Sequence, residues 1–242
     1  MENSQFYLGV ETSGHSGSVA IHGPQHQIVQ VDLQQQGRKH AQTLVAEVKK
    51  LLDQLDLSPS QITGIGVSRG PGSFTGLRIG TTFAKTFGYV TGCPVLGIDS
   101  FEAIALNCPP EIQETYVISN AQRGDLFVGK YTRISDSQWQ QISEIGLCEI
   151  DDFCRLLNPG ETISGPGVTL LDASSFSDVR LLEPEYRLPE AAKISLITAR
   201  ILQNCLPKQH EILSETWNLT PFYLRKSAAE EKWDAQQKDQ TD

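Results

Sequence analysis

The segment that most restricts the fold is a glycine-rich block at residues 70–80, which reads GPGSFTGLRIG. It follows an apolar run, Ile62 to Val67, and opens a stretch with helical character that ends near Tyr89. Glycine permits backbone angles that a β-carbon hinders, proline stiffens a turn, and Ser73 is a favourable helix N-cap. The block therefore predicts a tight connection from a buried strand into a helix.

Spacing alone leaves three interpretations of this block open. A helix N-terminus at the end of a strand is suited to an anion, but the lysine of the Walker A pattern is absent and the spacing G-x-G-x-x-x-G departs from the dinucleotide-binding pattern. Gly76 and Gly80 leave a smooth strip, bordered by Phe74, Leu77 and Arg78, that another helix can approach. A phosphate cradle, an internal helix crossing and a partner-binding surface all remain.

The order of elements predicts the fold class. Three short strands precede an apolar stripe at helical spacing from His40 to Leu55, and two strand–helix units follow. This order is typical of a ribonuclease H-like α/β layer with its later strands parallel to the first. Strands are expected at 6–10, 18–21, 29–33, 62–67, 95–98, 115–119, 125–131, 141–147 and 161–164, and helices at 40–55, 73–89, from 100, 151–157 and 191–206.

Composition excludes several classes of protein. The formal net charge of -9 argues against a chain-wide electrostatic grip on nucleic acid, while leaving room for a local basic patch. No stretch approaches the roughly 18 apolar residues of a membrane span, and the polar start lacks the pattern of a secretory signal. The five cysteines include no C-x-x-C pair. We expect a cytoplasmic protein with no membrane association, no disulfide framework and no zinc site.

The glycine block, the N-terminal Gly9-Val10-Glu11-Thr12-Ser13, the helix opening at His40 and the late Pro221-Phe222-Tyr223-Leu224-Arg225 together resemble the TsaB family, also called YeaZ. The resemblance runs from the first strand to Arg225. It implies the actin-like ATPase fold (ASKHA, ribonuclease H-like), with two lobes of which the second is reduced. The expected division is a first lobe at 1–107 with partner-binding helices, a second α/β lobe at 108–226 and a disordered polar tail at 227–242.

The same resemblance implies a function. TsaB proteins are noncatalytic partners of TsaD and, with the ATPase TsaE, help install threonylcarbamoyl on N6 of adenosine 37 in tRNAs that read codons beginning with A. By this resemblance the chain forms a heterodimer with TsaD, helps recruit TsaE and meets tRNA only through the complex. We expect no cofactor of its own. The subunit junction is a candidate site for ATP or ADP, and a homodimer of the chain alone is an alternative assembly.

Two catalytic alternatives fail on the residues. TsaD binds metal through a His-x-x-x-His pair, whereas here the residue four after His40 is Leu44. A ribonuclease H-type nuclease needs several carboxylates to hold two metal ions. Glu11 and Glu47 match the first two acids, but the fourth predicted strand ends in Ser68-Arg69, so the third acid is missing. We therefore expect no catalytic residues and no bound metal.

A third alternative is a small-molecule kinase or nucleotide-binding protein of the same fold. Thr12, Ser13 and Gly14 correspond to the phosphate-binding hairpin of actin-like kinases. The family usually has Asp in place of Glu11, so metal geometry inferred from the kinases is in doubt here. The segment from Asn120 to Asp125 likewise departs from the family pattern D-A-R-x-G-E, with amides in place of two charges.

The resemblance places the partner surface on the first two helices. A self-associating module that uses the same helices is a further alternative. The residues predicted to contact the partner are His40, Leu44, Val48, Phe74, Leu77, Arg78, Thr81 and Lys85.

Overall fold

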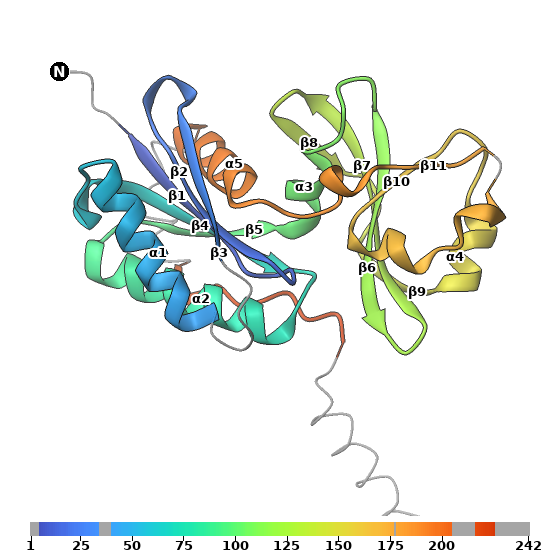
Figure 1. Ribbon diagram of the computed structural model, residues 1–242, viewed down its shortest axis with the longest axis horizontal. Coiled ribbons are helices and arrows are strands. Elements are labelled where there is room, and N and C mark those ends of the chain that lie inside the picture. Colours follow the sequence, from blue (N-terminus) through green and yellow to red (C-terminus); the bar gives the residue numbers. More distant parts are fainter. Residues whose placement is uncertain (1–4, 34–39, 177, 205–215, 226–242) are drawn as a thin grey trace, which may run out of the picture.

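The structure is a computed structural model that describes residues 5–33, 40–176, 178–204 and 216–225. These residues form two lobes, each built on its own β-sheet (Figure 1). The predicted polar tail at 227–242 lies outside the described residues, as do the last two positions of the predicted helix at 191–206.

The first lobe contains a five-stranded sheet in the order β3-β2-β1-β4-β5. Strands β1, β2 and β3 pair antiparallel, and β4 and β5 continue the sheet parallel to β1. The predicted meander and the parallel placement of the later strands are therefore confirmed. The strands are β1 (Phe6–Glu11), β2 (Gly17–His22), β3 (Ile28–Leu33), β4 (Ile62–Gly70) and β5 (Val95–Asp99).

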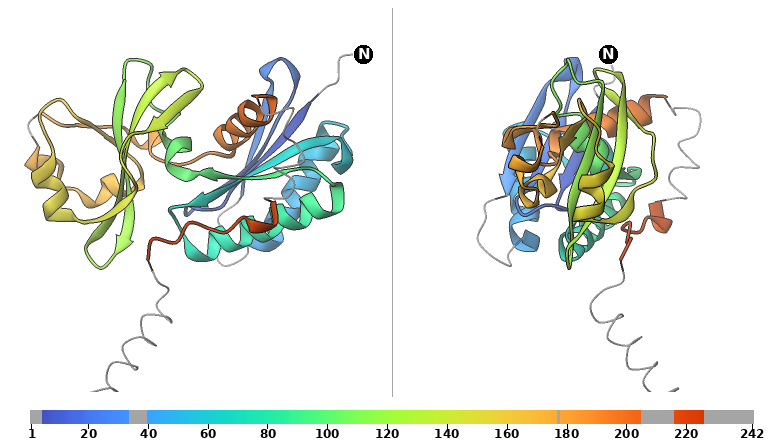
Figure 2. Two further views of the ribbon diagram at one scale, coloured as in Figure 1. Left: turned by 180° about the vertical axis from the view of Figure 1, so that it is seen from behind. Right: turned by 90° about the vertical axis from the view of Figure 1, so that its right-hand side faces the viewer.

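Helices cover both faces of this sheet (Figures 1 and 2). Helices α1 (His40–Gln54) and α2 (Phe74–Thr91) lie side by side on one face, and α5 (Ala191–Asn204) lies on the other, against β1, β2 and β4. Side chains of the sheet satisfy the first amides of α5: Ser18 Oγ accepts from the amide of Ala191 at 2.9 Å and Gln30 Oε1 from that of Ala192 at 2.8 Å.

Helix α5 belongs to the first lobe, although the predicted division assigned residues 108–226 to the second. The strands of the first sheet are buried on both faces, so a second apolar layer must cover the side opposite α1 and α2. The chain supplies that layer by returning from the second lobe. The described segment 216–225, called the strap below, also lies on the first lobe, along α2 (Figure 2, left).

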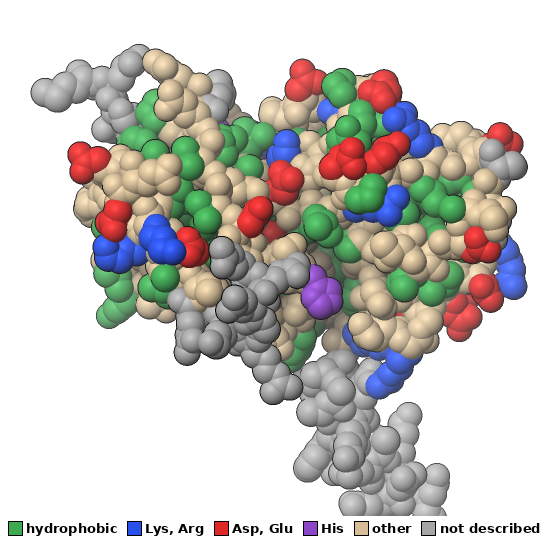
Figure 3. Space-filling view, in the orientation of Figure 1, with side chains coloured by type: hydrophobic (Ala, Val, Ile, Leu, Met, Phe, Trp, Pro, Cys, Tyr) green, Lys and Arg blue, Asp and Glu red, His purple; other side chains and the backbone are tan. Residues whose placement is uncertain are grey.

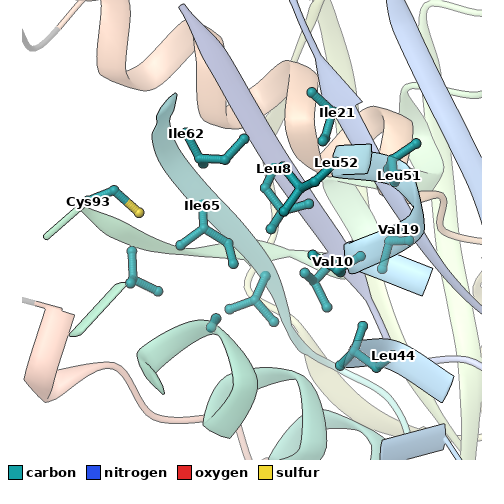
Figure 4. Packing of buried hydrophobic residues seen from close by; sticks show 14 of the residues in the cluster. Leu8, Val10, Val19, Ile21, Leu44, Leu51, Leu52, Ile62, Ile65 and Cys93 are labelled. Carbon is teal, nitrogen blue, oxygen red and sulfur yellow. The ribbon is translucent and has the colours of Figure 1, made fainter. Parts of the chain in front are cut away.

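The apolar stripe predicted from His40 packs onto the sheet (Figure 4). Leu44, Leu51 and Leu52 of α1 are at most 4% exposed and meet β1 side chains such as Leu8 and Val10. Each such burial contributes about 1.5–3 kcal/mol relative to an exposed side chain. The stripe thus fixes which face of α1 points inward.

The second lobe is a six-stranded sheet in the order β11-β10-β6-β7-β8, with β9 also paired to β7. A separate apolar cluster that includes Ile118, Leu126 and Phe153 fills the space between this sheet and α4. Its elements are β6 (Glu114–Gln122), β7 (Asp125–Ser135), β8 (Gln138–Gln141), β9 (Gly146–Glu149), α4 (Ile150–Leu156), β10 (Thr162–Ser164) and β11 (Arg180–Leu181). Single 3-10 turns occur at Pro24–His26, Pro59–Gln61, Pro166–Leu170, Ala173–Ser175, Pro184–Tyr186 and Thr216–Asn218.

The single strand predicted at 141–147 is wrong. In the structure this region contains the end of β8, a crossing segment at 142–145 and the start of β9. Strand β8 pairs with the second half of β7 and β9 with the first half, so the chain must cross from one to the other. The amide of Lys130 donates to Ser143 Oγ at 2.9 Å and holds the crossing in place.

The two lobes meet around the short helix α3 (Ser100–Ala105). The hydroxyl of Tyr131 in the second sheet donates to the carboxylate of Asp99 at the end of β5. Arg200 of α5 forms an ion pair with Glu102 of α3 at 2.7 Å. Burial raises the pKa of both Asp99 and Glu102, and the two hydrogen-bonded partners oppose that rise.

Among the described residues, no helix is long and apolar enough to cross a membrane.

Candidate functional site

The glycine block packs against the β1–β2 hairpin. A β-carbon on Gly76 would lie 1.9 Å from the carbonyl oxygen of Thr12, and one on Gly80 would lie 2.3 Å from Thr12 Oγ1. Both distances are far below van der Waals contact, so only glycine permits this approach. The Ser73 amide donates to the Ser13 carbonyl at 2.7 Å. Of the three interpretations, the internal crossing is therefore realised, with a hairpin rather than a helix as the neighbour.

Ser73 caps α2 as predicted. Its hydroxyl accepts a hydrogen bond from the amide of Gly76 at 3.3 Å. The N-terminus of the helix thus faces the hairpin of its own chain and is capped by its own serine. This arrangement leaves the block as a structural joint between β4, α2 and the hairpin.

The carboxylate of Glu11 occupies the donors of the hairpin. Its Oε1 accepts from the amide of Ser13, from Ser13 Oγ at 2.6 Å and from the amide of Gly14 at 3.3 Å. In an actin-like kinase, the donors of the corresponding hairpin face the nucleotide phosphates. Thr12 and Ser13 are also buried. The hairpin therefore does not present these donors to a phosphate, and the predicted phosphate loop does not fit one.

Glu11 is fully buried, and this burial raises the pKa of its carboxyl group. The hydrogen bonds from Ser13, Ser68 and Gly14 oppose the rise because they stabilise the ionised form. Among the described residues, Oε2 has no hydrogen-bond partner. A buried carboxylate oxygen without a partner favours protonation.

The residues matched to a nuclease do not form a metal site. Glu11 is committed to the hairpin, and Glu47 of α1 forms an ion pair with Lys50 at 2.7 Å. Ser68, at the end of β4, accepts from the amide of Thr12 at 3.2 Å. No cluster of three potential metal ligands occurs within the described ranges. The TsaD-type metal pair does not fit either, because Leu44 is 1% exposed in the core.

The predicted partner residues separate into three groups. Leu44, Val48, Leu77 and Thr81 are buried, so as contacts to another protein they are wrong. Their positions are those of the inward-facing stripe of each helix, where burial in the chain's own core is more favourable. The side chain of His40 lies outside the described part of the chain.

Phe74, Arg78 and Lys85 contact the strap instead. Lys85 Nζ donates to the Trp217 carbonyl at 3.0 Å, and Arg78 Nε donates to the Tyr223 hydroxyl at 3.2 Å. The Phe74 and Tyr223 rings lie 4.7 Å apart. These residues are at the surface, but part of each side chain is covered by the strap.

Sequence reasoning missed the apolar side chains that remain exposed. Val45 on α1 is 58% exposed and Val90 on α2 is 75% exposed. Helical geometry, at 100° per residue, places Val90 on the side of α2 that carries Ile79 and Phe83, and Arg78 and Lys85 on another side. The predicted contacts came from the middle of the apolar stripe, whereas Val45 occupies the i+4 position of the stripe on α1 and lies at its exposed edge.

The departure at Asn120–Asp125 forms a tight turn between β6 and β7. Asn120 Oδ1 accepts from the amide of Gln122 at 2.7 Å, and Gln122 and Arg123 both adopt positive φ. Asparagine tolerates such turns through this side-chain bond. Arg225 of the strap donates to the carbonyls of Ala121 at 2.6 Å and Gln122 at 3.0 Å. The strap therefore connects α2 to the tip of the second lobe.

Known proteins are similar to this chain in sequence. A family model described as TsaD, tRNA N6-adenosine threonylcarbamoyltransferase, matches residues 31–233, which is most of the chain. The tRNA threonylcarbamoyladenosine biosynthesis protein TsaB of Bacillus subtilis is 28% identical over 202 residues, covering 83% of this chain and 86% of that protein. The chain belongs to the TsaB (YeaZ) family. The TsaB of Buchnera aphidicola subsp. Schizaphis graminum is 23% identical over 68% of this chain and 80% of its own.

Solved structures agree on the fold. YeaZ from Pseudomonas aeruginosa has a TM-score of 0.71 and 20% identity, with 91% of this chain and 99% of that chain covered. A second Pseudomonas aeruginosa structure, described as similar to peptidase YEAZ, has a TM-score of 0.73 and 20% identity, covering 92% and 99%. The chain thus has the two-lobed actin-like ATPase fold that the sequence predicts. In this chain the carboxylate of Glu11 accepts the hydrogen bonds of the β1–β2 hairpin.

Proposed function

We propose that the chain is a noncatalytic subunit of the assembly that forms N6-threonylcarbamoyladenosine at position 37 of tRNAs reading codons that begin with A. Its relatives carry this pathway in their names, and the family model that matches it is that of the transferase TsaD. On this proposal the chain binds a TsaD-type protein and helps recruit a TsaE-type ATPase. It works in the cytoplasm, and any ATP or ADP lies at the junction with the partner.

The observation that carries the noncatalytic role is the burial of Leu44. This residue holds the second position of the histidine spacing that TsaD uses for metal, and it is 1% exposed among the core leucines of α1. A histidine introduced there would face apolar side chains. The hairpin supports the same conclusion, because Glu11 already uses the donors that a kinase of this fold offers to phosphate.

The proposed partner face consists of the outer side of α1 and the adjoining side of α2. It contains the exposed side chains Val45, Thr86 and Val90. Exposed apolar residues on neighbouring helices are suited to helix–helix association with a protein of similar fold. The face keeps the two helices of the sequence prediction but replaces its inward-facing residues.

Size-exclusion chromatography with light scattering tests this proposal. The chain and a TsaD-type protein, mixed at equal concentration, are expected to elute as a heterodimer, while the chain alone forms a weaker homodimer through the same face. Val45→Glu should weaken both. A chain that stays alone in the presence of TsaD, yet binds ATP and magnesium in calorimetry and turns it over, would instead support the kinase alternative.

A further inference from the structure

The strap and the outer side of α2 differ in charge from the rest of the chain. Residues 57–98 and 216–225 contain Arg69, Arg78, Lys85 and Arg225 but no Asp or Glu. All 29 acidic residues lie elsewhere, and on the face shown in Figure 3 they are spread over both lobes. A chain with a net charge of -9 thus keeps the segment 57–98, which includes β4 and α2, and the strap free of acidic residues.

Along the end of β4, α2 and the strap, cations alternate with aromatic rings. The Arg78 guanidinium lies 3.9 Å from the centre of the Phe74 ring and 5.9 Å from that of Tyr223, and Arg69 lies 5.9 Å from that of Phe222. At the other end, the Tyr89 and Trp217 rings meet edge to face at 5.8 Å beside Lys85. The residues Phe74, Arg69, Arg78, Lys85, Tyr89, Trp217, Phe222 and Tyr223 are called the strip below. Arg225 is not part of it, because its guanidinium lies 3.3 Å from the carboxylate of Asp125.

The aromatic side chains of the strip are accessible, and hydrogen bonds hold the strap against β4 and α2. Tyr89 is 73% exposed, Trp217 56%, Tyr223 42% and Phe222 38%. The strap is fixed by backbone contacts, since the Phe222 amide donates to the Arg69 carbonyl at 2.7 Å. Within the described ranges, Arg78 and Lys85 each donate one N–H to the strap, which leaves their other donors for a ligand.

The strip is separate from the proposed partner face. In Figure 1 α1 lies in front of α2, and in the reverse view of Figure 2 the strap lies in front of α2 with α1 behind it. Helical geometry agrees, because Arg78, Lys85 and Tyr89 share one side of α2 while Val90 lies on another. A partner bound to α1 and the adjoining side of α2 therefore leaves the strip open.

We propose that this strip binds single-stranded RNA, with arginine and lysine contacting phosphates and the exposed rings stacking on bases. This inference rests on the proposed function, in which RNA is the substrate of the assembly. Surfaces that bind single strands without reading sequence combine a positive track with aromatic platforms in this way. Because RNA carries a phosphate on every nucleotide, charge complementarity favours it over a protein partner, for which an acid-free surface is not required.

Fluorescence anisotropy with a labelled single-stranded RNA of about 12 nucleotides, a length that spans typical site sizes, tests the strip. The full chain is titrated at several salt concentrations. Each lost phosphate contact should reduce the slope of log affinity against log salt by about 0.7. In the double variant Arg78→Ala/Lys85→Ala the slope should therefore be smaller by about 1.4. Trp217→Ala should instead lower the affinity about tenfold and leave the slope almost unchanged. The conservative variant Trp217→Phe should keep most of the wild-type affinity.

Lys49→Ala/Lys50→Ala is the matched control, because it removes two lysines from the neighbouring helix α1. Thermal unfolding of every variant separates lost binding from lost folding. Equal effects of the control and the strip variants, or no binding by the wild-type chain, overturn the inference. So does loss of TsaD binding in the strip variants with RNA binding unchanged, which would make the strip a protein surface. Failure of the wild-type chain to bind TsaD is a different result and contradicts the proposed function instead.

Discussion

Gly76 lies so close to Thr12 that a β-carbon on the glycine would stand 1.9 Å from the threonine carbonyl oxygen. This contact joins the first turn of α2 to the β1–β2 hairpin. It explains why the glycine block is needed by the fold, independently of any ligand. The hairpin, in turn, is held by Glu11, so the joint is formed entirely within the chain.

Replacing Gly76 with alanine should destabilise the protein by about 3 kcal/mol, because backbone, and not a flexible side chain, must move to admit the methyl group. Urea denaturation measures the loss. Gly146→Ala is the control, since a β-carbon there meets nothing within 4 Å. If both variants unfold at the wild-type urea concentration, the close approach does not exist in solution.

Glu11 predicts a dependence of stability on pH. Its pKa in the folded state is raised above the ordinary value of 4.5, so the folded chain binds this proton more tightly than the unfolded chain does. The stabilisation is therefore complete below pH 4.5 and is lost as the pH rises through the raised pKa. Glu11→Gln keeps an accepting oxygen for Ser13 and cannot ionise. Its free energy of unfolding should fall less than that of the wild type as the pH rises from about 4 to about 8.

Other buried acids contribute to the wild-type profile, so the difference between the two proteins isolates Glu11. Asp136→Asn, at an exposed turn, removes one carboxylate elsewhere and serves as the control. Parallel curves for wild type and Glu11→Gln over the whole range would contradict a raised pKa.

Two adjacent residues of α1 should separate stability from association. Leu44→Ala is expected to cost about 3 kcal/mol of stability through a core cavity. Val45→Glu should change stability by less than about 0.5 kcal/mol, because the side chain is 58% exposed. Binding to a TsaD-type protein, measured by biolayer interferometry, should nevertheless weaken at least about tenfold. Unchanged binding would remove Val45 from the partner face.

Arg225 is expected to fix the turn between β6 and β7. Arg225→Ala leaves the carbonyls of Ala121 and Gln122 without this donor. Amide hydrogen exchange in residues 120–125 should become faster, while exchange in α4 stays as in the wild type. Equal exchange rates in the turn with and without Arg225 would show that the turn is stable without this side chain.

The fold was predictable where local pattern and topology agree. The stripe on α1 and the parallel placement of β4 and β5 follow from spacing and element order. The return of α5 to the first sheet was not predictable, because nothing local states which sheet a distant helix will cover. The break at 142–145 was missed for a similar reason, since it depends on which half of β7 each short strand pairs with.

Several of the side chains predicted to contact the partner are wrong. The two helices were identified by resemblance, but the apolar residues that defined them, such as Leu44 and Leu77, are those a helix buries. The strap contacts at Arg78 and Lys85 join positions more than a hundred residues apart, so no spacing rule reveals them. The hydrogen bonds from the hairpin to Glu11 were not predictable either, because they depend on the direction in which this one side chain points.

The central claim, that this chain is a noncatalytic but necessary subunit, is tested most directly by reconstitution. The formation of N6-threonylcarbamoyladenosine is measured on a tRNA with TsaD-type and TsaE-type proteins and a threonylcarbamoyl donor, with and without this chain. We predict modification only when all three proteins are present, with activity lost in Val45→Glu and none from this chain alone. Full modification in its absence, or modification by this chain by itself, would contradict the account.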